Sequence, residues 1–476
     1  MRNKYAPLTV SLVLFFATHL ALAQGGNELY QTYCASCHGE DLMGGNGSSF
    51  LDGQWKHGSG KGQITRNIRF GIAQVGMPAF DKVLDEDQVG SILDYILEAE
   101  QGAMASNDSI PNQLQTLDYN VDVEVFAEGL SIPWAIAFVD DSHMLVTERS
   151  GQLRMIANGE LQDAVQGTPE VLAEGQGGLL DVAVDPEYDQ NGWVYLSFSH
   201  KLESDTAETA GAMTKLVRGK IEDNQWVDEE VIFEAPHELY ITTRHHYGDR
   251  IVFDPEGHLY FSIGERGQQD QAQDITRPNG KIHRINRDGS IPEDNPFVNE
   301  PDAIPSIFTY GNRNPQGLAV HPQTGQVWET EHGPMGGDEV NIVKAGANYG
   351  WPVITYGRNY NGTSITDITQ KEGMEQPIKY WKPSIAVCGI EFYQGNEFAR
   401  WENKLLVGAL AYEEVRLLSV VDNRVMHDEV IMKNVGRVRD VAPGPDGAIY
   451  VVMNEPDIIL KLTASEEQAT VDAGEE

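Results

Sequence analysis

The chain has 476 residues, of which 41% are hydrophobic and 22% charged, a balance that is ordinary for a folded soluble protein. Its 72 acidic and 34 basic residues give a formal net charge of −38. Such an excess of negative charge argues against binding to nucleic acid or to anionic membrane surfaces, because both require basic patches. The length allows two or three domains, or one large all-β unit with a smaller one.

Residues 1–23 have the pattern of a secretory signal. Arg2 and Lys4 form a basic end, and an apolar stretch follows over residues 8–20. A small-residue cleavage site, Ala-Leu-Ala, stands at residues 21–23. The apolar stretch is interrupted by polar residues and is short for a membrane span. We therefore expect an exported protein without a membrane span, which in a bacterium means a periplasmic one.

The next motif is Cys34-Ala-Ser-Cys37-His38. A bare C-x-x-C could be a redox dithiol or half of a zinc site, but a histidine directly after it makes it the attachment signature of c-type haem. Cys34 and Cys37 would then form thioethers with the porphyrin, and His38 would ligate the iron. A zinc site would need further Cys or His ligands, and the remaining cysteine, Cys388, lies far downstream.

The residues around this motif predict a small helical unit. The spacing of Leu29, Tyr30 and Tyr33 indicates a short helix before the haem motif. Further on, Met77 stands in a proline-stiffened loop, and Asp85 is placed to cap a helix with one apolar face. Helix, haem motif, Met-Pro loop and closing helix, in this order, resemble a class I cytochrome c, which is an all-α domain.

This resemblance covers residues 24–101 and implies that Met77 is the sixth ligand of the haem iron. Met43 and His57 are the alternatives for that position. Met77 is favoured because a Met-Pro loop directly before the final helix is the pattern of the family.

Residues 102–118 are polar and without periodicity, which is typical of a linker. Beyond them, over residues 119–465, a theme recurs: a short apolar run, a turn with acidic, Pro or Gly residues, and an alternating strand. It occurs six times, starting near residues 137, 182, 251, 318, 390 and 441. Repeated strand pairs that cannot bury both faces alone predict a β-propeller, here an all-β, six-bladed one. Residues 466–476 form an acidic tail.

Two loops near residues 310–351 carry candidate binding groups. Arg313 has a planar fork that suits carboxylates or quinone oxygens. Gly333 and Pro334 can turn their backbone carbonyls outward, because proline lacks an N–H group and glycine permits unusual dihedral angles. With Asp338 and Glu339 close in sequence, such carbonyls would suit a hard cation such as Ca²⁺.

Eight segments of the propeller region resemble, in order, those of the soluble PQQ-dependent aldose sugar dehydrogenases, relatives of soluble quinoprotein glucose dehydrogenase. They are residues 175–180, 246–250, 263–267, 280–292, 311–317, 331–334, 346–352 and 437–440. Each motif alone is only weak evidence for this family. Eight motifs in the order of the family are strong evidence for it. The resemblance covers nearly the whole propeller region.

The resemblance implies a catalytic role for His246, as the general base that takes a proton from the anomeric hydroxyl of the sugar. Glu265 stands where the family has an acidic residue that orients this histidine. Arg313 would lie near the reactive quinone oxygens, and the carbonyls of Gly333 and Pro334 would hold Ca²⁺.

The same resemblance implies that PQQ is held by a set of polar and basic side chains. They are Gln176, Arg313, Asn314, Arg437 and Arg439. PQQ carries three carboxylates, so a strongly acidic protein needs a local cluster of arginines to bind it.

The chain also departs from the family pattern. Ala411 replaces a lysine that contacts PQQ in the glucose enzyme, which implies fewer cationic contacts with the cofactor. His245 replaces an aspartate that helps to hold the sugar, so a preference for glucose is not implied. Tyr380 and Trp381 lie in the segment that lines the sugar pocket of relatives. Cys388 is expected to be a buried free thiol.

These features together predict a periplasmic enzyme that oxidises the C1 hydroxyl of aldose sugars to the lactone. Its cofactors would be PQQ, Ca²⁺ and haem c, and the haem would pass single electrons to an external acceptor, a cytochrome or another component of the respiratory chain. Two alternatives of different class are a non-catalytic carbohydrate- or partner-binding propeller and a Ca²⁺-dependent lactonase-like hydrolase. Neither accounts for His246, the arginines and the haem motif together.

Overall fold

The structure is a computed structural model that describes residues 25–40, 42, 47, 49–51, 61–72, 76–105, 110–202 and 210–465. It divides into two compact units, residues 1–107 and 108–476. The predicted signal (1–23) and acidic tail (466–476) lie outside the described residues. No helix in the described part of the chain combines the length and apolarity needed to cross a membrane.

The N-terminal unit is helical. Its helices are α1 (Gly26–Tyr33), α2 (Ala35–His38), α3 (Lys61–Phe70) and α4 (Glu86–Ala105). Helix α4 starts with a reciprocal cap: the Asp85 carboxylate accepts the backbone N–H of Gln88 at 2.9 Å, and the Gln88 side chain accepts that of Asp85 at 3.0 Å. Val89, Ile92 and Ile96 of α4 are buried in the core that this helix shares with α1 and α3, as the sequence pattern predicts.

Regular structure enters the predicted linker (102–118) from both ends. Helix α4 continues to Ala105, because Ala, Glu, Gln and Met favour a helix strongly enough to tolerate the single Gly102. The strand β1 (Gln113–Gln115) already pairs with β2 (Asn120–Ala127). A three-residue edge strand is held by its neighbour in space and leaves no local signal.

The second unit is a propeller of six antiparallel sheets, which confirms the predicted fold. Its further strands are β3 (Pro133–Phe138), β4 (His143–Glu148), β5 (Gln152–Ala157), β6 (Glu160–Leu161), β7 (Leu179–Val184), β8 (Val194–Lys201), β9 (Ala212–Glu222), β10 (Gln225–Glu234), β11 (Ile251–Phe253), β12 (His258–Ile263), β13 (Lys281–Asn286), β14 (Ile307–Tyr310), β15 (Pro315–Val320), β16 (Val327–Glu331), β17 (Asp338–Ile342), β18 (Lys379–Trp381), β19 (Val387–Phe392), β20 (Leu405–Ala409), β21 (Glu414–Val421), β22 (Arg424–Lys433), β23 (Arg437–Pro443), β24 (Ile449–Asn454) and β25 (Ile458–Ala464). Five sheets each use four consecutive strands, and the sixth has the order β1-β2-β25-β24-β23. Short helical turns lie between strands, at α5 (Tyr188–Asn191), η2 (His237–Leu239), η3 (Gln269–Gln273) and η4 (Ala399–Trp401).

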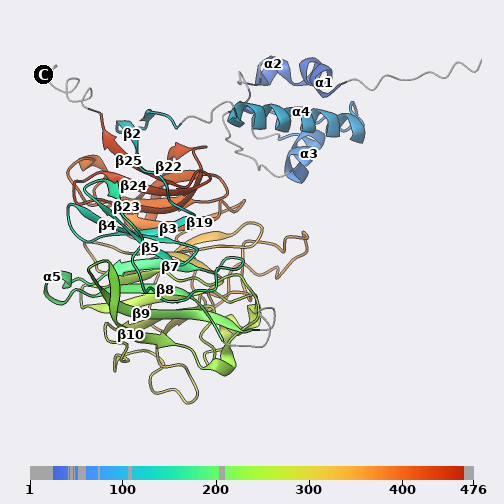
Figure 1. The fold of residues 1–476 in the computed structure, drawn as a ribbon. Coiled ribbons are helices and arrows are strands. Elements are labelled where there is room, and N and C mark those ends of the chain that lie inside the picture. The colour runs from blue at the N-terminus through green and yellow to red at the C-terminus, as the bar shows by residue number, and fades with distance from the viewer. Residues whose placement is uncertain are drawn as a thin grey trace, which may run out of the picture. The chain divides into compact units, whose positions relative to one another are not determined.

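The sixth sheet closes the ring. Its N-terminal strand β2 pairs with β25, from Val121 opposite Ala464 to Ala127 opposite Ile459. Figure 1 shows β2 beside β25, so that strands from the two ends of the propeller meet in one sheet. The first and last strands of a ring leave no unpaired edge between them when they join in this way.

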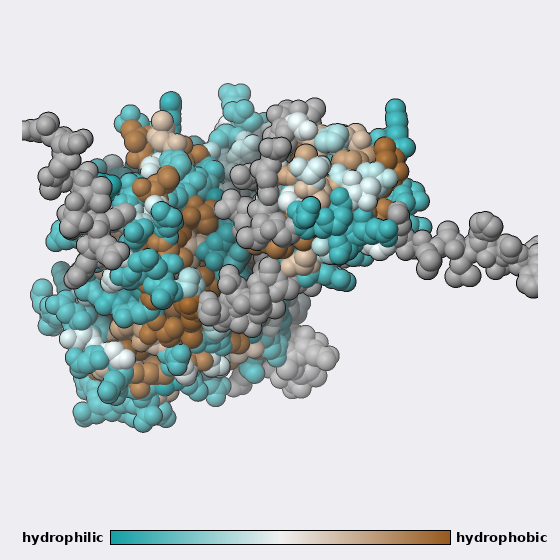
Figure 2. Space-filling model, turned by 90° about the horizontal axis from the view of Figure 1, so that it is seen from above, coloured by the Kyte–Doolittle hydropathy of each residue, from teal (hydrophilic) through white to brown (hydrophobic). Residues whose placement is uncertain are grey.

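The hydrophobic core of the propeller lies between neighbouring sheets. Among the described residues it forms six clusters, one at each junction of adjacent sheets. Trp328 and Phe261 are fully buried members of this core. On the side of the propeller that Figure 2 displays, hydrophobic residues form a band that hydrophilic residues flank. Each sheet thus buries both faces against its neighbours, as the repeat pattern predicts.

The innermost strand of each sheet faces the axis of the ring. These strands are β3, β7, β11, β15, β19 and β23, and each contacts the next around the ring. The residues at their N-terminal ends, and the loops that enter them, therefore converge on the axis. The candidate site is built there.

Candidate functional site

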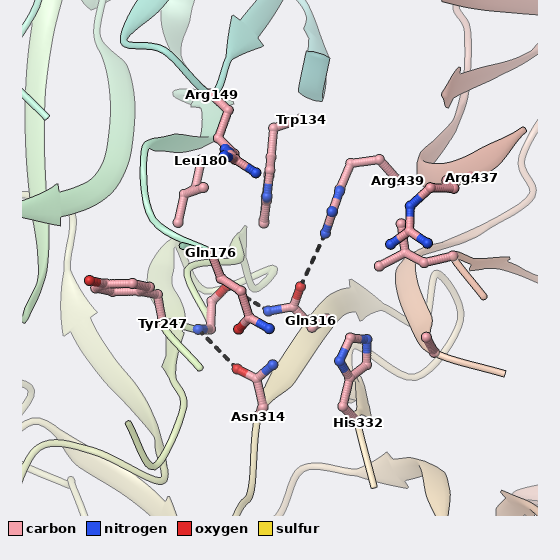
Figure 3. A pocket seen from close by; sticks show the side chains of 13 residues that line it. Trp134, Arg149, Gln176, Leu180, Tyr247, Asn314, Gln316, His332, Arg437 and Arg439 are labelled. Atoms are coloured by element: carbon pink, nitrogen blue, oxygen red, sulfur yellow. Dashed lines mark hydrogen bonds between the residues drawn. The ribbon is translucent and has the colours of Figure 1, made fainter. Parts of the chain in front are cut away.

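A cavity of about 330 Å³ lies where the inner strands and their loops converge. The predicted residues Gln176, Asn314, Arg437 and Arg439 all line it (Figure 3). Three arginines contribute to the described lining, with Arg149 as the third, and none of the lining residues is acidic. In a protein of net charge −38, such a wall attracts an anion.

His246 lies beside this cavity and is held through its ring and its backbone N–H. Its Nδ1 is 2.5 Å from Oε1 of the buried Glu265, and its backbone N–H donates to Oε1 of Gln176 at 2.7 Å. Its backbone has φ of 57°, a left-handed conformation that is strained for a non-glycine residue. The next residues in sequence enter the cavity wall, where Gly248 N–H donates to Oδ1 of Asn314 at 3.2 Å.

The electrostatic surroundings keep the imidazole of His246 neutral. Burial lowers its pKa well below 6.5, and the electrostatic effects of Arg313, His245 and Arg266 lower it further. Burial also raises the pKa of Glu265, against the opposing effect of Arg313. Nδ1 is occupied by Glu265, and no hydrogen bond to Nε2 is found within the described residues. Nε2 is therefore the nitrogen available to accept a proton.

Arg313 lies next to this pair, and its backbone carbonyl accepts the N–H of Glu265 at 2.7 Å. Its Nη1 donates to the backbone carbonyls of His332 at 3.0 Å and Gly333 at 2.9 Å. Its guanidinium carbon lies 5.3 Å from the centre of the Trp351 ring. Its Nε has no hydrogen-bond partner in the described part of the chain, so one donor direction is left for a ligand.

The predicted calcium ligands form an oxygen-rich wall. The Gly333 carbonyl accepts one hydrogen bond from Arg313, and the Pro334 carbonyl accepts one from Oγ of Ser384 at 3.0 Å, which leaves each oxygen one lone pair. A small cavity next to Gly333 is also lined by Glu331 and Glu339.

Burial raises the pKa of Glu331 to about 7 and that of Glu339 well above its usual value, so a cation close by would compensate charges that are costly here. The donor chemistry fits Ca²⁺.

Asp338, which lies close to these carbonyls in sequence, is hydrogen-bonded to the backbone of the loop that carries them and of a neighbouring strand. Its two carboxylate oxygens accept the backbone N–H groups of Gly333 at 2.8 Å and Val387 at 3.2 Å. It therefore braces the loop that carries the two carbonyls. Among the described residues, no three His, Cys, Asp or Glu side chains converge in a metal-binding arrangement.

The arginines of the cavity fit a cofactor with several carboxylates. Arg439 has Nη1 3.5 Å from Oε1 of Gln316 and 3.6 Å from the sulfur of the buried Cys388, and its Nε has no partner in the described residues. Burial lowers the pKa of Arg439. The guanidinium of Arg437 makes no hydrogen bond or ion pair within the same residues. Guanidinium donors without protein partners are what bound carboxylates would satisfy, so these residues fit PQQ.

The structure shows the surroundings of the residues that depart from the family pattern. His245 packs edge-on against His246, with ring centres 4.7 Å apart. Tyr380 stacks on Tyr356 at 3.9 Å, and Trp381 is buried. Ala411 follows the lining residue Leu410, where its short side chain supplies no cation.

Several lining residues were not singled out from the sequence, and those with aromatic or basic side chains are Trp134, Arg149, Tyr247 and His332. His332 stands between Glu331 and Gly333 of the loop already considered, and burial lowers its pKa to about 4, so its ring is neutral at pH 7. The Gly-Pro loop directly after His332 was the sequence signal that could have placed it in the site. Arg149 follows a strand end in an ordinary Thr-Glu-Arg sequence, which carries no local signal.

In the helical unit, Cys34 precedes α2, and Cys37 and His38 lie on it. Both cysteines are free thiols, and the His38 ring stacks on Phe50 with centres 4.3 Å apart. Burial, with a smaller effect of Cys37, raises the pKa of the Cys34 thiol to about 11. Two free thiols one helical turn apart and an adjacent histidine fit covalent haem.

Met77 is pinned in its loop by a two-way backbone pairing with Ile72, at 3.0 and 3.2 Å. Gly71 permits this close approach, because a Cβ there would lie 2.6 Å from the Met77 carbonyl oxygen. Met77 also packs against the core of the unit. The alternative ligands Met43 and His57 lie outside the described residues.

Comparison with known proteins follows the same division of the chain. Residues 130–461 match the family described as Glucose / Sorbosone dehydrogenase, and residues 21–96 match the family described as Cytochrome C oxidase, cbb3-type, subunit III. Aldose sugar dehydrogenase YliI of Escherichia coli (strain K12) is 42% identical over 342 residues, which cover 70% of this chain and 90% of that protein.

Two solved structures resemble the propeller. The apo-form of the soluble aldose sugar dehydrogenase from Escherichia coli has a TM-score of 0.67 and 39% identity, and covers 72% of this chain and all of its own. The PQQ-bound form of aldose sugar dehydrogenase from Streptomyces coelicolor has a TM-score of 0.59 and 26% identity, over 72% of this chain and 98% of its own. The chain therefore belongs to the glucose/sorbosone dehydrogenase family, with a cytochrome c domain in front of its propeller.

Proposed function

We propose that the protein is a quinohaemoprotein that oxidises the C1 hydroxyl of an aldose sugar to the lactone. PQQ, when bound in the cavity, supplies the quinone that takes up the C1 hydrogen as a hydride. The similarity to an aldose sugar dehydrogenase and to a PQQ-bound relative supports this assignment. The observation that carries it is a buried His246–Glu265 pair beside a cavity without acidic lining residues.

His246 takes the second product of the oxidation, the proton of the anomeric hydroxyl. Its Nε2 is the acceptor, because Nδ1 already donates to Glu265. The lowered pKa of His246 keeps the imidazole neutral, and so able to accept, at neutral pH. Glu265 holds the tautomer and the orientation of the ring, and its negative charge stabilises the imidazolium that forms.

The remaining site residues hold the cofactors. Arg437 and Arg439 present guanidinium groups to the carboxylates of PQQ, and Gln176 and Asn314 fix the loops beside them. Arg313 faces the quinone end, next to the Gly333 carbonyl. Calcium, when bound by the carbonyls of the 333–334 loop, would act as a Lewis acid on the quinone oxygens.

The helical unit carries the exit route for electrons. Cys34, Cys37 and His38 bind haem c, with Met77 as the sixth ligand of the iron. A one-electron carrier on the same chain lets two electrons from each sugar leave singly, toward an external acceptor. Export to the periplasm, with removal of residues 1–23, belongs to the same proposal.

The test compares His246→Ala with His237→Ala, a matched variant at an exposed histidine. Both proteins are reconstituted with PQQ and Ca²⁺ and supplied with a panel of aldoses and an artificial electron acceptor. General-base catalysis contributes on the order of 10²–10⁴-fold, so His246→Ala should lose that much turnover while retaining PQQ, and His237→Ala should match the wild type. Equal turnover of all three would refute the assignment of the base.

The same preparation tests the electron route. In the wild type, an oxidisable sugar should reduce the haem, which the absorption spectrum reports. A full-length variant with Cys34→Ala and Cys37→Ala should lack bound haem but still oxidise sugar with the artificial acceptor. Loss of sugar oxidation in that variant, with the propeller folded and PQQ bound, would contradict the proposed order of the cofactors.

A further inference from the structure

We propose that Arg149 binds a carboxylate of the cofactor, so that three guanidinium groups, those of Arg149, Arg437 and Arg439, clamp PQQ in the cavity. This inference rests on the proposed function and adds a cofactor-binding residue to it. It follows from the position of Arg149, from its lack of partners and from the backbone that presents it.

Arg149 reaches the cavity from a different sheet than the other two arginines. It directly follows β4, whereas Arg437 and Arg439 lie on β23 of the closing sheet. Figure 3 shows all three among the side chains that point into the same cavity. An anion between them would therefore be held from two sheets, which a pair of arginines on one strand cannot achieve.

The guanidinium of Arg149 is unpaired within the described residues. No hydrogen bond, ion pair or ring contact of this group is found there, although the chain has 72 acidic and only 34 basic residues. Its neighbour in sequence, Glu148, instead accepts from the backbone N–H of Ser131 at 2.8 Å and lies 3.4 Å from Nη1 of Arg154. Arginine carries five donors, and a cavity-lining arginine without partners is suited to a ligand that supplies acceptors.

The backbone of Arg149 is fixed for this presentation. Its N–H donates to the carbonyl of Ile132 at 3.1 Å, and its carbonyl accepts the N–H of Leu179 at 3.2 Å. Gly178 packs directly against it: a Cβ at that position would lie 2.1 Å from the Arg149 carbonyl oxygen and 2.5 Å from its Cγ. Any larger residue at position 178 would displace the side chain, so the glycine keeps the arginine in place.

The ligand that matches Arg149 is a carboxylate and not a sugar hydroxyl. A planar guanidinium pairs with a carboxylate through two parallel hydrogen bonds, and such charge-assisted bonds are about twice as strong as neutral ones. PQQ has three carboxylates, and Arg149, Arg437 and Arg439 supply three guanidinium groups without acidic residues beside them in the cavity wall. An aldose is uncharged and gains less from this cation.

The experiment measures PQQ binding directly, on the full-length haem-containing protein freed of PQQ. Wild type, Arg149→Ala, Arg149→Gln and Arg149→Lys are titrated with PQQ, and binding is followed by quenching of tryptophan fluorescence. Loss of one charge-assisted contact should weaken binding by Arg149→Ala and Arg149→Gln roughly 10- to 100-fold, with partial recovery in Arg149→Lys. Arg424→Ala, which removes an equal charge from an exposed position on β22, should bind like the wild type.

A second titration uses the trimethyl ester of PQQ, which lacks all three carboxylate charges. Wild type and Arg149→Gln should bind this ester equally, because the charge that Arg149 recognises is absent. Should Arg149→Ala fail to fold, judged by circular dichroism, Arg149→Gln decides the question.

Binding of PQQ by Arg149→Gln within about twofold of the wild type, a difference near the error of such titrations, would overturn this inference and leave the proposed function intact. Failure of the wild type to bind PQQ would overturn both.

Discussion

At the scale of single residues, the site depends on an imidazole held under strain. His246 has a left-handed backbone, its N–H is tied to Gln176 and its ring to Glu265. Strain of this kind costs on the order of 1–3 kcal/mol and persists where the surroundings over-determine the conformation. The arrangement orients Nε2 before any substrate arrives, which is a condition for efficient general-base catalysis.

The positive charges around His246 predict its pH dependence. Burial is the largest cause of the lowered pKa of His246, and the charge of Arg266 adds to it. Arg266 is itself buried, with its guanidinium carbon 3.4 Å from the centre of the Tyr247 ring. The neutral base is lost as pH falls through this pKa, which lies well below 6.5. Removal of the charge in Arg266→Gln should raise the pKa of His246 toward 6.5, so kcat/KM should begin to fall at a higher pH than in the wild type.

This prediction is checked by measuring kcat/KM of both proteins with PQQ bound, from about pH 8 down to about pH 4. The acid limb of the profile is the readout, because a general loss of stability would lower the whole curve without moving the limb. An acid limb at the same or a lower pH in Arg266→Gln would contradict the electrostatic account.

At the scale of elements, the cap of α4 shows what local sequence can specify. Asp85 and Gln88 exchange hydrogen bonds with each other's backbone N–H groups. Asp85→Ala should therefore lower the unfolding free energy of the helical unit by about 1 kcal/mol, the usual cost of a lost N-cap. Denaturant unfolding followed by haem absorbance measures this. Asp87→Ala, in the first turn but without a capping bond, should cost less; an equal cost would argue against the cap.

The elements that could be predicted from the sequence are formed by residues close together in the chain. The elements that could not be predicted depend on contacts between distant residues. The helix cap at Asp85, the apolar face of α4 and the six strand repeats are local sequence patterns, and all of them appear in the structure. The pairing of β2 with β25 joins segments more than three hundred residues apart, and β1 has no pattern of its own. In the site, Gln176 and Arg437 could be predicted because they stand in motifs that resemble those of the family. Arg149 stands in no such motif, and only the arrangement of the sheets in the ring brings it to the cavity.

At the scale of the whole molecule, Arg250 links the sheets at the axis. Its Nη1 lies 3.2 Å from Asp181 on β7 and 3.1 Å from Asp440 on β23, and its Nε donates to the Gln316 carbonyl on β15 at 2.9 Å. Its guanidinium carbon is 4.2 Å from the centre of the Trp134 ring on β3. One buried cation thus connects strands of several sheets beneath the cavity that holds Trp134 and Gln316.

Breaking this network should destabilise the propeller strongly. Arg250→Met leaves two carboxylates buried without their counter-charge, which typically costs about 3–5 kcal/mol. Denaturant unfolding of the propeller, followed by tryptophan fluorescence, measures the loss. Combining Arg250→Met with Asp181→Asn and Asp440→Asn should restore part of it. A triple variant less stable than Arg250→Met alone would show that the unpaired charges are not the cause.

The meeting of β2 and β25 in one sheet has a consequence for the order of the chain. Gln113 donates through Nε2 to Oγ of Ser465 at 3.0 Å, so the two ends of the propeller touch. A short peptide could join them, and a cut in an exposed loop between two other sheets would then give new termini with every strand pair intact. Such a circularly permuted chain should fold into the same ring. The position of the chain ends therefore decides to which sheet the cytochrome is attached. The pairing of the strands within the ring does not depend on it.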